Sequence, residues 1–134
     1  MVKCIISTVL FGLLISGCAP HRGEKPFWGH EYTENNETLV VLDSGLASRL
    51  RLVDEATDKT ADSRLIVKAK LMNRLEKTMR IQVQTVFKDA KGFSTGDETN
   101  WELIIIPAKA YYYYEVKAMN AKAAGYVIRC RYAK

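Results

Sequence analysis

Thiols, imidazoles and carboxylates are the groups of this chain that could carry out chemistry, so their spacing is considered first. His21 and His30 are its two histidines, and both precede the segments in which regular structure is expected. A hydrolytic zinc site needs three clustered ligands, and a nucleophilic serine or cysteine needs a base beside it. Carboxylates in a polar connection are usually solvated, which applies to Asp43, Asp54, Glu55, Asp58 and Asp62. We therefore expect no enzymatic activity, no metal ion and no cofactor.

Cys18 is the residue whose surroundings point most clearly to a reaction. It is preceded by Ser16 and Gly17 and follows an apolar run, residues 5 to 15, that lies behind Lys3. This run is too short for a membrane-spanning helix, which needs about 20 residues. Small residues before Cys18 let an extended backbone enter a peptidase cleft, and the thiol is the nucleophile for lipidation. The arrangement resembles the bacterial lipobox.

The lipobox resemblance implies a chain that is cleaved and anchored by lipid. Residues 1–17 would be the signal peptide, cut between Gly17 and Cys18, and Cys18 would carry a diacylglyceryl group and an N-acyl chain. Two or more acyl chains anchor stably, whereas a single chain binds marginally. Ala19 replaces the Asp that resembles an inner-membrane retention signal, so we expect the inner leaflet of the outer membrane, facing the periplasm. An uncleaved apolar helix with an incidental cysteine is the alternative.

The charge balance is mildly basic, with 20 Lys and Arg against 15 Asp and Glu and a net charge of +5. Removal of residues 1–17 takes away only Lys3. Such an excess favours anionic surfaces such as phospholipid headgroups or acidic polymers, and it is too dispersed to indicate a nucleic-acid groove. We expect no nucleic-acid partner.

Cys130 is the thiol that would remain free in the mature chain, because Cys4 lies in the signal peptide and Cys18 is acylated. No internal disulfide is then available. Cys130 alternates with apolar and aromatic neighbours, Tyr126, Ile128 and Tyr132. The pattern predicts a buried thiol that packs as a small hydrophobic side chain.

Residues 18–37 are rich in polar residues, Gly and Pro and show no sustained apolar periodicity, which predicts a tether. Twenty flexible residues span about 25 Å on average, so the domain would stay near its membrane. Phe27, Trp28 and Tyr32 interrupt the polar sequence. They could dock at the headgroup level of the membrane or pack on the domain.

Residues 38–134 show short β-rich runs separated by turn residues, with no amphipathic helix between them. This pattern predicts an all-β domain, an antiparallel β-sandwich with Greek-key connections and about seven strands. A helical run near residues 44–52 is the main alternative to this all-β prediction. Residues 54–62 are expected to be a polar connection. The expected strands are residues 39–42, 50–53, 64–72, 78–88, 101–106, 110–118 and 125–133.

Alternation in three of these strands predicts which side chains enter the core. The expected inward sets are Leu65, Val67, Ala69 and Leu71; Met79, Ile81, Val83, Thr85 and Phe87; and Tyr112, Tyr114, Val116 and Ala118. Residues 73–77 have the length of a hairpin loop, and Asn73 suits such a turn because it tolerates a positive φ.

Four features between residues 39 and 132 occur in a characteristic order: Leu71-Met72-Asn73, the strand that ends in residues 87–92 (Phe-Lys-Asp-Ala-Lys-Gly), Trp101, and Ile106-Pro107-Ala108. In this order they resemble the YcfL family of small bacterial lipoproteins. Phe87 stands where the family usually has a tryptophan. The resemblance implies an immunoglobulin-like or fibronectin-like sandwich and an envelope location, and it leaves activity open.

In the order that this resemblance implies, strands 78–88, 110–118 and 125–133 are neighbours in one sheet. Their outward side chains would then form a single candidate binding face: Arg80, Gln82, Gln84, Tyr111, Tyr113, Arg129 and Arg131. Tyrosine and arginine are common in interaction hot spots. The tyrosines could equally stabilise the sheet through cross-strand packing.

Two functions follow as hypotheses. The first is a lipid-anchored, non-enzymatic interaction module that presents this face to an envelope protein or to an acidic polymer such as peptidoglycan. The second is a structural accessory that lies on the lipid surface. The sequence does not define the partner or the oligomeric state.

Overall fold

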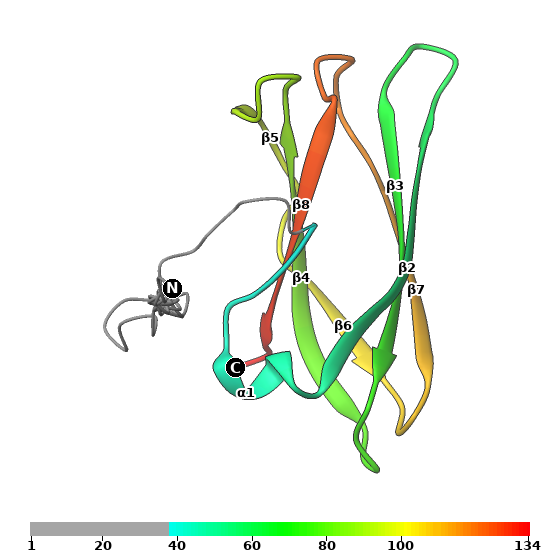
Figure 1. The fold of residues 1–134 in the computed structure, drawn as a ribbon, viewed down its shortest axis with the longest axis vertical. Coiled ribbons are helices and arrows are strands. Elements are labelled where there is room, and N and C mark those ends of the chain that lie inside the picture. Colours follow the sequence, from blue (N-terminus) through cyan, green and yellow to red (C-terminus); the bar gives the residue numbers. More distant parts are fainter. Residues whose placement is uncertain (1–37) are drawn as a thin grey trace, which may run out of the picture. The chain divides into compact units, whose positions relative to one another are not determined.

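The computed structural model describes residues 38–134, which form two β-sheets packed face to face (Figure 1). This confirms the predicted all-β sandwich, with eight strands in place of about seven. Within this part of the chain one short helix is present, α1 (Ser44–Ala47). The strands are β1 (Leu39–Val41), β2 (Leu50–Lys59), β3 (Leu65–Asn73), β4 (Met79–Lys88), β5 (Ser94–Glu98), β6 (Glu102–Ile106), β7 (Tyr111–Lys117) and β8 (Gly125–Tyr132).

The smaller sheet has the order β2-β3-β7, and the larger sheet has the order β1-β8-β4-β5. Strand β6 also pairs with β4, so β5 and β6 share one edge of β4. Strand β6 pairs with its N-terminal half and β5 with its C-terminal half. The order β2-β3-β7 against β8-β4-β5 is that of immunoglobulin-like Greek keys. Strand β1 differs from that plan because it lies beside β8 and runs parallel to it.

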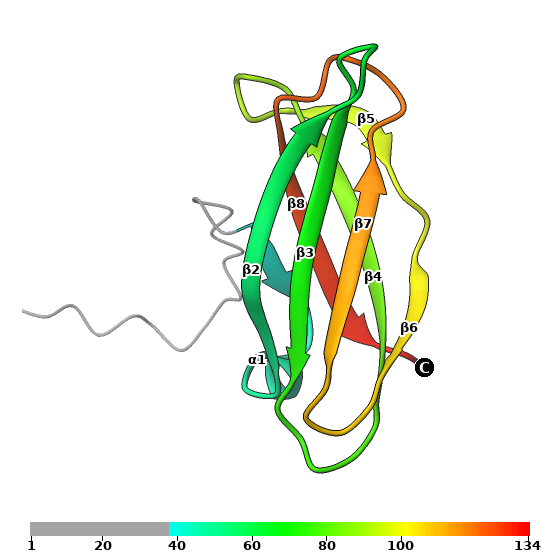
Figure 2. The same cartoon turned by 90° about the vertical axis from the view of Figure 1, so that its right-hand side faces the viewer.

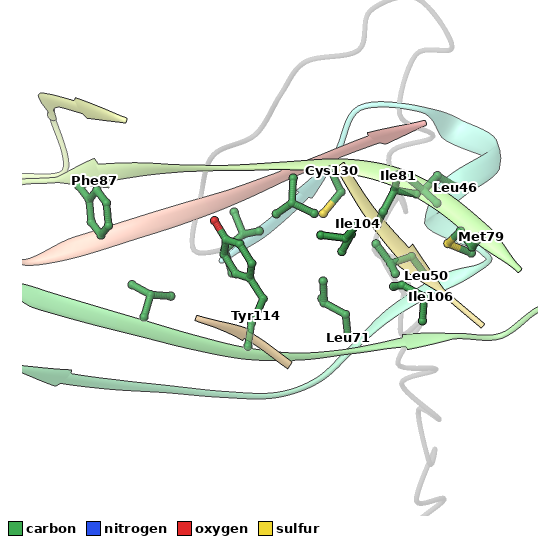
Figure 3. Packing of buried hydrophobic residues seen from close by; sticks show 14 of the residues in the cluster. Leu46, Leu50, Leu71, Met79, Ile81, Phe87, Ile104, Ile106, Tyr114 and Cys130 are labelled. Carbon is green, nitrogen blue, oxygen red and sulfur yellow. The ribbon is translucent and has the colours of Figure 1, made fainter. Parts of the chain in front are cut away.

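The core lies between the two sheets and is built by the predicted alternation (Figure 3). Every second residue of β3 is buried, from Leu65 to Asn73, and so is every second residue of β4, from Met79 to Phe87. Tyr114 and Cys130 extend the core from β7 and β8. Full burial of an aliphatic or aromatic side chain contributes about 1.5–3 kcal/mol, so these residues dominate the stability of the domain.

The prediction of a hairpin at residues 73–77 is wrong, because β3 and β4 belong to different sheets and this segment crosses between them. Asn73 also has no positive φ; its side chain is buried and bonds the crossing segment instead. Its Nδ2 donates to the carbonyl oxygens of Lys77, Ile106 and Pro107 at 2.8 to 3.0 Å. Its Oδ1 accepts from the backbone N–H of Leu75 at 2.9 Å.

Strand β2 is longer than predicted, and the expected polar connection at residues 54–62 is wrong for this reason. The strand continues to Lys59, after a register shift between Leu52 and Asp54. It lies at an edge of the smaller sheet and is mostly exposed, so polar side chains are tolerated there. Strand β5 was not predicted because its sequence, Ser-Thr-Gly-Asp-Glu, lacks apolar alternation. The helical run near residues 44–52 forms only α1, which buries Leu46.

Several predictions fall outside the described residues. They concern the signal peptide at residues 1–17, the lipid attachment at Cys18, and the tether at residues 18–37 with His21, His30, Phe27, Trp28 and Tyr32.

Candidate interaction surfaces

The predicted binding face is divided between the two sheets, so its residues do not form one surface. Its arginines and glutamines lie on the neighbouring strands β4 and β8: Arg80, Gln82, Gln84, Arg129 and Arg131. Tyr111 and Tyr113 lie on β7, which pairs with β3 in the other sheet. The expectation that the tyrosine strand neighbours β4 and β8 is therefore wrong. Alternation shows which side of a strand faces the core, but not which sheet the strand joins.

Arg131 is fixed in position on the outer side of the larger sheet. Its guanidinium carbon lies 4.0 Å from the centroid of the Trp101 ring, and its Nε donates to Gln82 Oε1 at 2.9 Å. Ring stacking and a hydrogen bond together orient the planar group. Its two terminal nitrogen atoms make no hydrogen bond to any residue from 38 to 134, so they can bond an external carboxylate.

Leu103 and Ile105 of β6 add an apolar part to this surface, with 46% and 53% of their areas exposed. In the register they lie opposite Gln82 and Arg80 of β4. Residues 103–106 are all apolar, so alternation could not show which two would face solvent. We call the surface formed by these residues the arginine face: Arg80, Gln82, Arg131, Leu103 and Ile105.

Gln84 and Arg129 face each other in the β4–β8 register but are less accessible than predicted. Gln84 is buried because its Nε2 donates to the carbonyl oxygen of Thr99, in the β5–β6 connection, at 3.1 Å. Arg129 is half-buried and lies beside Val40 of β1. Gln84 therefore positions a connection and does not reach a partner.

The outer side of the smaller sheet, which faces the viewer in Figure 2, is formed by β2, β3 and β7. Strand β7 carries the two exposed tyrosines. Tyr111 is 48% exposed and Tyr113 is 73% exposed, as their outward positions predict. Lys70 Nζ lies 4.5 Å from the Tyr111 ring centroid and 5.5 Å from that of Tyr113. Lys68 Nζ lies 3.8 Å from Glu115 Oε2. Both lysines therefore point toward β7.

A hollow of about 350 Å³ lies on this side of the sandwich. It was not predicted, because its shape depends on which side chains are neighbours across three strands. All three strands of the smaller sheet line it, with Asp54, Glu55, Ala56, Lys68, Ala69, Lys70, Tyr113, Tyr114 and Glu115.

Two solved structures of bacterial proteins have a similar architecture. The chain is similar to cj0090 of Campylobacter jejuni, with a TM-score of 0.62 and 15% identity, over 72% of this chain and 99% of that one. It is also similar to a DUF1425 family member from Shewanella sp. pv-4, with a TM-score of 0.55 and 18% identity, over 63% and 79% of the two chains. The fold is shared with small bacterial β-sandwich proteins. No family model matches the sequence, and no curated protein is similar to it.

Cys130 is fully buried, as predicted from the alternation of β8. Burial raises the pKa of its thiol to about 12, because the thiolate would lose its hydration. A thiol that stays protonated is a poor nucleophile. The Cys130 side chain therefore packs in the core and is not expected to react.

Residues 38–134 contain no group of three or more His, Cys, Asp or Glu side chains placed to hold a metal ion. In the same part of the chain, no helix has the length and apolar character needed to cross a membrane.

Proposed function

We propose that the protein is a lipid-anchored, non-enzymatic interaction module of the bacterial envelope, whose arginine face binds an acidic surface of another envelope protein. The observation that carries this proposal is the fixed guanidinium of Arg131, held by Trp101 and Gln82 beside exposed apolar side chains. Arginine and aromatic residues with a small apolar centre are the usual composition of interaction hot spots.

The charge of the arginine face favours an acidic partner. The outward positions that face one another on β4, β6 and β8 carry arginine, lysine, glutamine, glycine and apolar residues, without an acidic residue. Complementary charge steers encounters and selects against basic partners. Leu103 and Ile105 would supply the apolar contact that charge alone does not provide.

The anchor in this proposal is the diacylglyceryl and N-acyl lipid on Cys18, at the inner leaflet of the outer membrane. The apolar run followed by Ser16, Gly17 and Cys18 supports it, and the resemblance to the YcfL family is consistent with it. A tether of about 20 residues would keep the arginine face within some tens of ångströms of the membrane. Its partner would then be a membrane protein or a protein bound near the membrane.

Photo-crosslinking in cells tests the proposed surface. A photoreactive phenylalanine analogue at Leu103 should capture a discrete partner, whereas the same analogue at Val53, exposed on the other sheet, should not. Arg131→Ala should then weaken capture, since loss of a hot-spot residue costs about 2 kcal/mol or more of binding. Arg131→Lys should weaken it as well, because lysine keeps the charge but lacks the planar fork.

The matched control is Lys117→Ala, which removes an equal charge from an exposed position on β7. It should leave capture unchanged. Equal capture by wild type and Arg131→Ala, with unchanged melting temperatures, would exclude the arginine face as the binding surface.

A lipid-surface accessory is the second candidate, and one observation favours it. Phe93 and Met119 are 69% and 81% exposed in loops at the same end of the sandwich (Figure 1). The Met119 N–H donates to Asp97 Oδ2 at 2.6 Å, which holds its loop against β5. A chain that begins at residue 19 should then float with anionic vesicles in a salt-sensitive manner. Phe93→Ser with Met119→Ser should abolish flotation, whereas Leu103→Ser with Ile105→Ser should not.

A further inference from the structure

The hollow on the smaller sheet lies on the opposite side of the sandwich from the arginine face and serves no role in the function proposed above. Two rows of outward side chains cross the sheet at this level: Asp54, Lys70 and Tyr113 in one row, and Ala56, Lys68 and Glu115 in the next. Lys68 and Lys70 point toward β7, where Glu115 and the tyrosine rings lie. Ala56 contributes only a methyl group on the β2 side. The hollow therefore results from this small residue and from the direction of both lysines.

The outward groups around the hollow are polar but balanced in charge. On the outer side, Asp54 and Glu115 supply two carboxylates, and Lys68 and Lys70 supply two ammonium groups. Glu55 also lines the hollow, but it belongs to the row of the buried residues Ala69 and Tyr114, and its Oε2 already accepts a hydrogen bond from the Tyr126 hydroxyl at 3.0 Å. The ammonium of Lys68 already has Glu115 as a partner, and that of Lys70 lies over tyrosine rings. A charged ligand would have to compete with these contacts. A hydroxyl group can join them, because a carboxylate accepts several hydrogen bonds and an ammonium donates three.

Tyr113 adds a flat apolar surface to this polar site. With 73% of its area exposed, most of the ring faces water, although Lys70 approaches it from one side. An aromatic ring next to hydrogen-bonding side chains suits a ligand that has both C–H faces and hydroxyl edges. Sugars have this chemistry, with nonpolar ring faces and polar rims.

We infer that this hollow binds a neutral, polyhydroxylated glycan, stacked on Tyr113 and hydrogen-bonded by Asp54, Lys68 and Glu115. Its volume, about 350 Å³, is at the small end of ligand pockets and suits a short stretch of glycan. The hollow reaches all three strands, and β2 and β7 are the edges of the sheet (Figure 2). A longer glycan can therefore lie across the sheet and continue beyond either edge.

Calorimetric titration of the full chain with chitotetraose and with maltotetraose tests this inference. The chain is purified from membranes in a detergent without a sugar headgroup, so that the detergent does not occupy the hollow. We expect saturable binding of at least one oligosaccharide. Because the ligand is neutral, its affinity should be the same at about 0.05 M and 0.5 M NaCl.

Two substitutions probe the hollow, and a third is the matched control. Tyr113→Ala removes the stacking surface, and Ala56→Trp fills the space from β2 without removing a contact. Each should weaken binding about tenfold or more, which corresponds to the loss of one good aromatic contact. Tyr111→Ala removes a tyrosine from the same strand that does not line the hollow, and it should change the affinity by about twofold or less.

Several results would overturn the inference. Absence of saturable binding to both oligosaccharides would do so, as would equal losses in Tyr111→Ala and Tyr113→Ala. Salt-sensitive binding, or binding of a zwitterionic tetrapeptide in place of the oligosaccharides, would show that the site recognises charge. Melting temperatures of the three variants show whether any loss reflects unfolding.

Discussion

The hydroxyl oxygen of Tyr114 on β7 lies 2.8 Å from Thr85 Oγ1 on β4, and both residues are buried. This hydrogen bond joins the two sheets inside the core, where the Tyr114 side chain extends from the smaller sheet toward the larger one (Figure 3). Burial raises the pKa of the Tyr114 phenol above its ordinary value, against an opposing effect of the Thr85 hydroxyl. The phenol therefore stays neutral and bonded throughout the physiological range.

Loss of one partner in this pair should destabilise the domain. Tyr114→Phe and Thr85→Val should each lower the free energy of unfolding by about 1–3 kcal/mol, because the remaining hydroxyl loses a hydrogen bond inside the core. The double variant should lose less than the sum of the two. Urea denaturation measures all three. Tyr112→Phe, on the same strand but half-buried, is the control and should have little effect. Strict additivity would show that the two hydroxyls do not interact in solution.

Asn73 should be the polar residue whose replacement is most costly. Its side chain makes the four hydrogen bonds described above, and they tie the β3–β4 crossing to residues 106–107. Asn73→Ala should reduce the free energy of unfolding by about 2–4 kcal/mol, since one buried and three partly buried hydrogen bonds are lost together. Asn120→Ala is the matched control, because Asn120 Oδ1 accepts one exposed bond from Lys122 N. Similar losses in the two variants would contradict the structural role of Asn73.

The inward side of the long strands could be predicted from the sequence because their apolar alternation is regular. Val67 and Leu71 on β3, and Ile81 and Phe87 on β4, are buried as expected. Pairing could not be predicted in this way. The alternation around Tyr113 would be the same whether its strand paired with β3 or with β8. Which strand it pairs with depends on how the whole chain crosses between the sheets.

The candidate binding face was predicted as one set of outward residues, of which those on β4 and β8 lie side by side, but the contacts that shape each site were not predicted. Arg131 was expected to face outward, but its contact with Trp101 joins positions 30 residues apart in the chain and has no local signal. The hollow beside Ala56 arises in the same way, from side chains on three strands. Strand β2 was shortened in the prediction because an exposed edge strand lacks the apolar pattern on which the prediction relied.

Cys18→Ser should abolish lipid attachment and remove the protein from the outer-membrane fraction. The reason is that the thiol of Cys18 is the predicted acceptor of the diacylglyceryl group. Growth with radiolabelled palmitate followed by membrane fractionation measures both effects. Cys4→Ser is the control, because Cys4 lies within the predicted signal peptide and its loss should leave labelling intact. Label on the Cys18→Ser protein would remove the central premise of the proposed anchor.

Cys130 should be inaccessible to reagents while the domain is folded. In a chain that begins at residue 19, Cys130 is the sole cysteine. A bulky maleimide should leave it unmodified in native buffer and modify it in denaturant, because the side chain has 0% exposure. Met119→Cys in the same chain provides an exposed thiol that should react at once. Fast native modification of Cys130 would mean that the inward side of β8 is assigned incorrectly.

The stability of the domain should fall in alkaline solution, and Cys130 should begin this fall. The unfolded thiol ionises near its ordinary pKa of about 8.5, whereas burial raises the pKa of the folded thiol to about 12. The stabilisation from this group is therefore complete below about pH 8.5 and is lost as the pH rises toward the folded value. The decline can reach about 1.4 kcal/mol per pH unit for one proton.

Tyr126 should add to this decline at higher pH. Its pKa is raised strongly, first by burial and then by its hydrogen bond to Glu55 Oε2 at 3.0 Å. An unfolded tyrosine ionises near pH 10, so its contribution begins later than that of Cys130. Urea denaturation at pH 7, 9, 10 and 11 should show a fall in wild type from about pH 9 and, in Cys130→Ala, only from about pH 10. An identical change in stability of the two proteins between pH 7 and pH 10 would show that the Cys130 thiol is not sequestered from water in the folded domain.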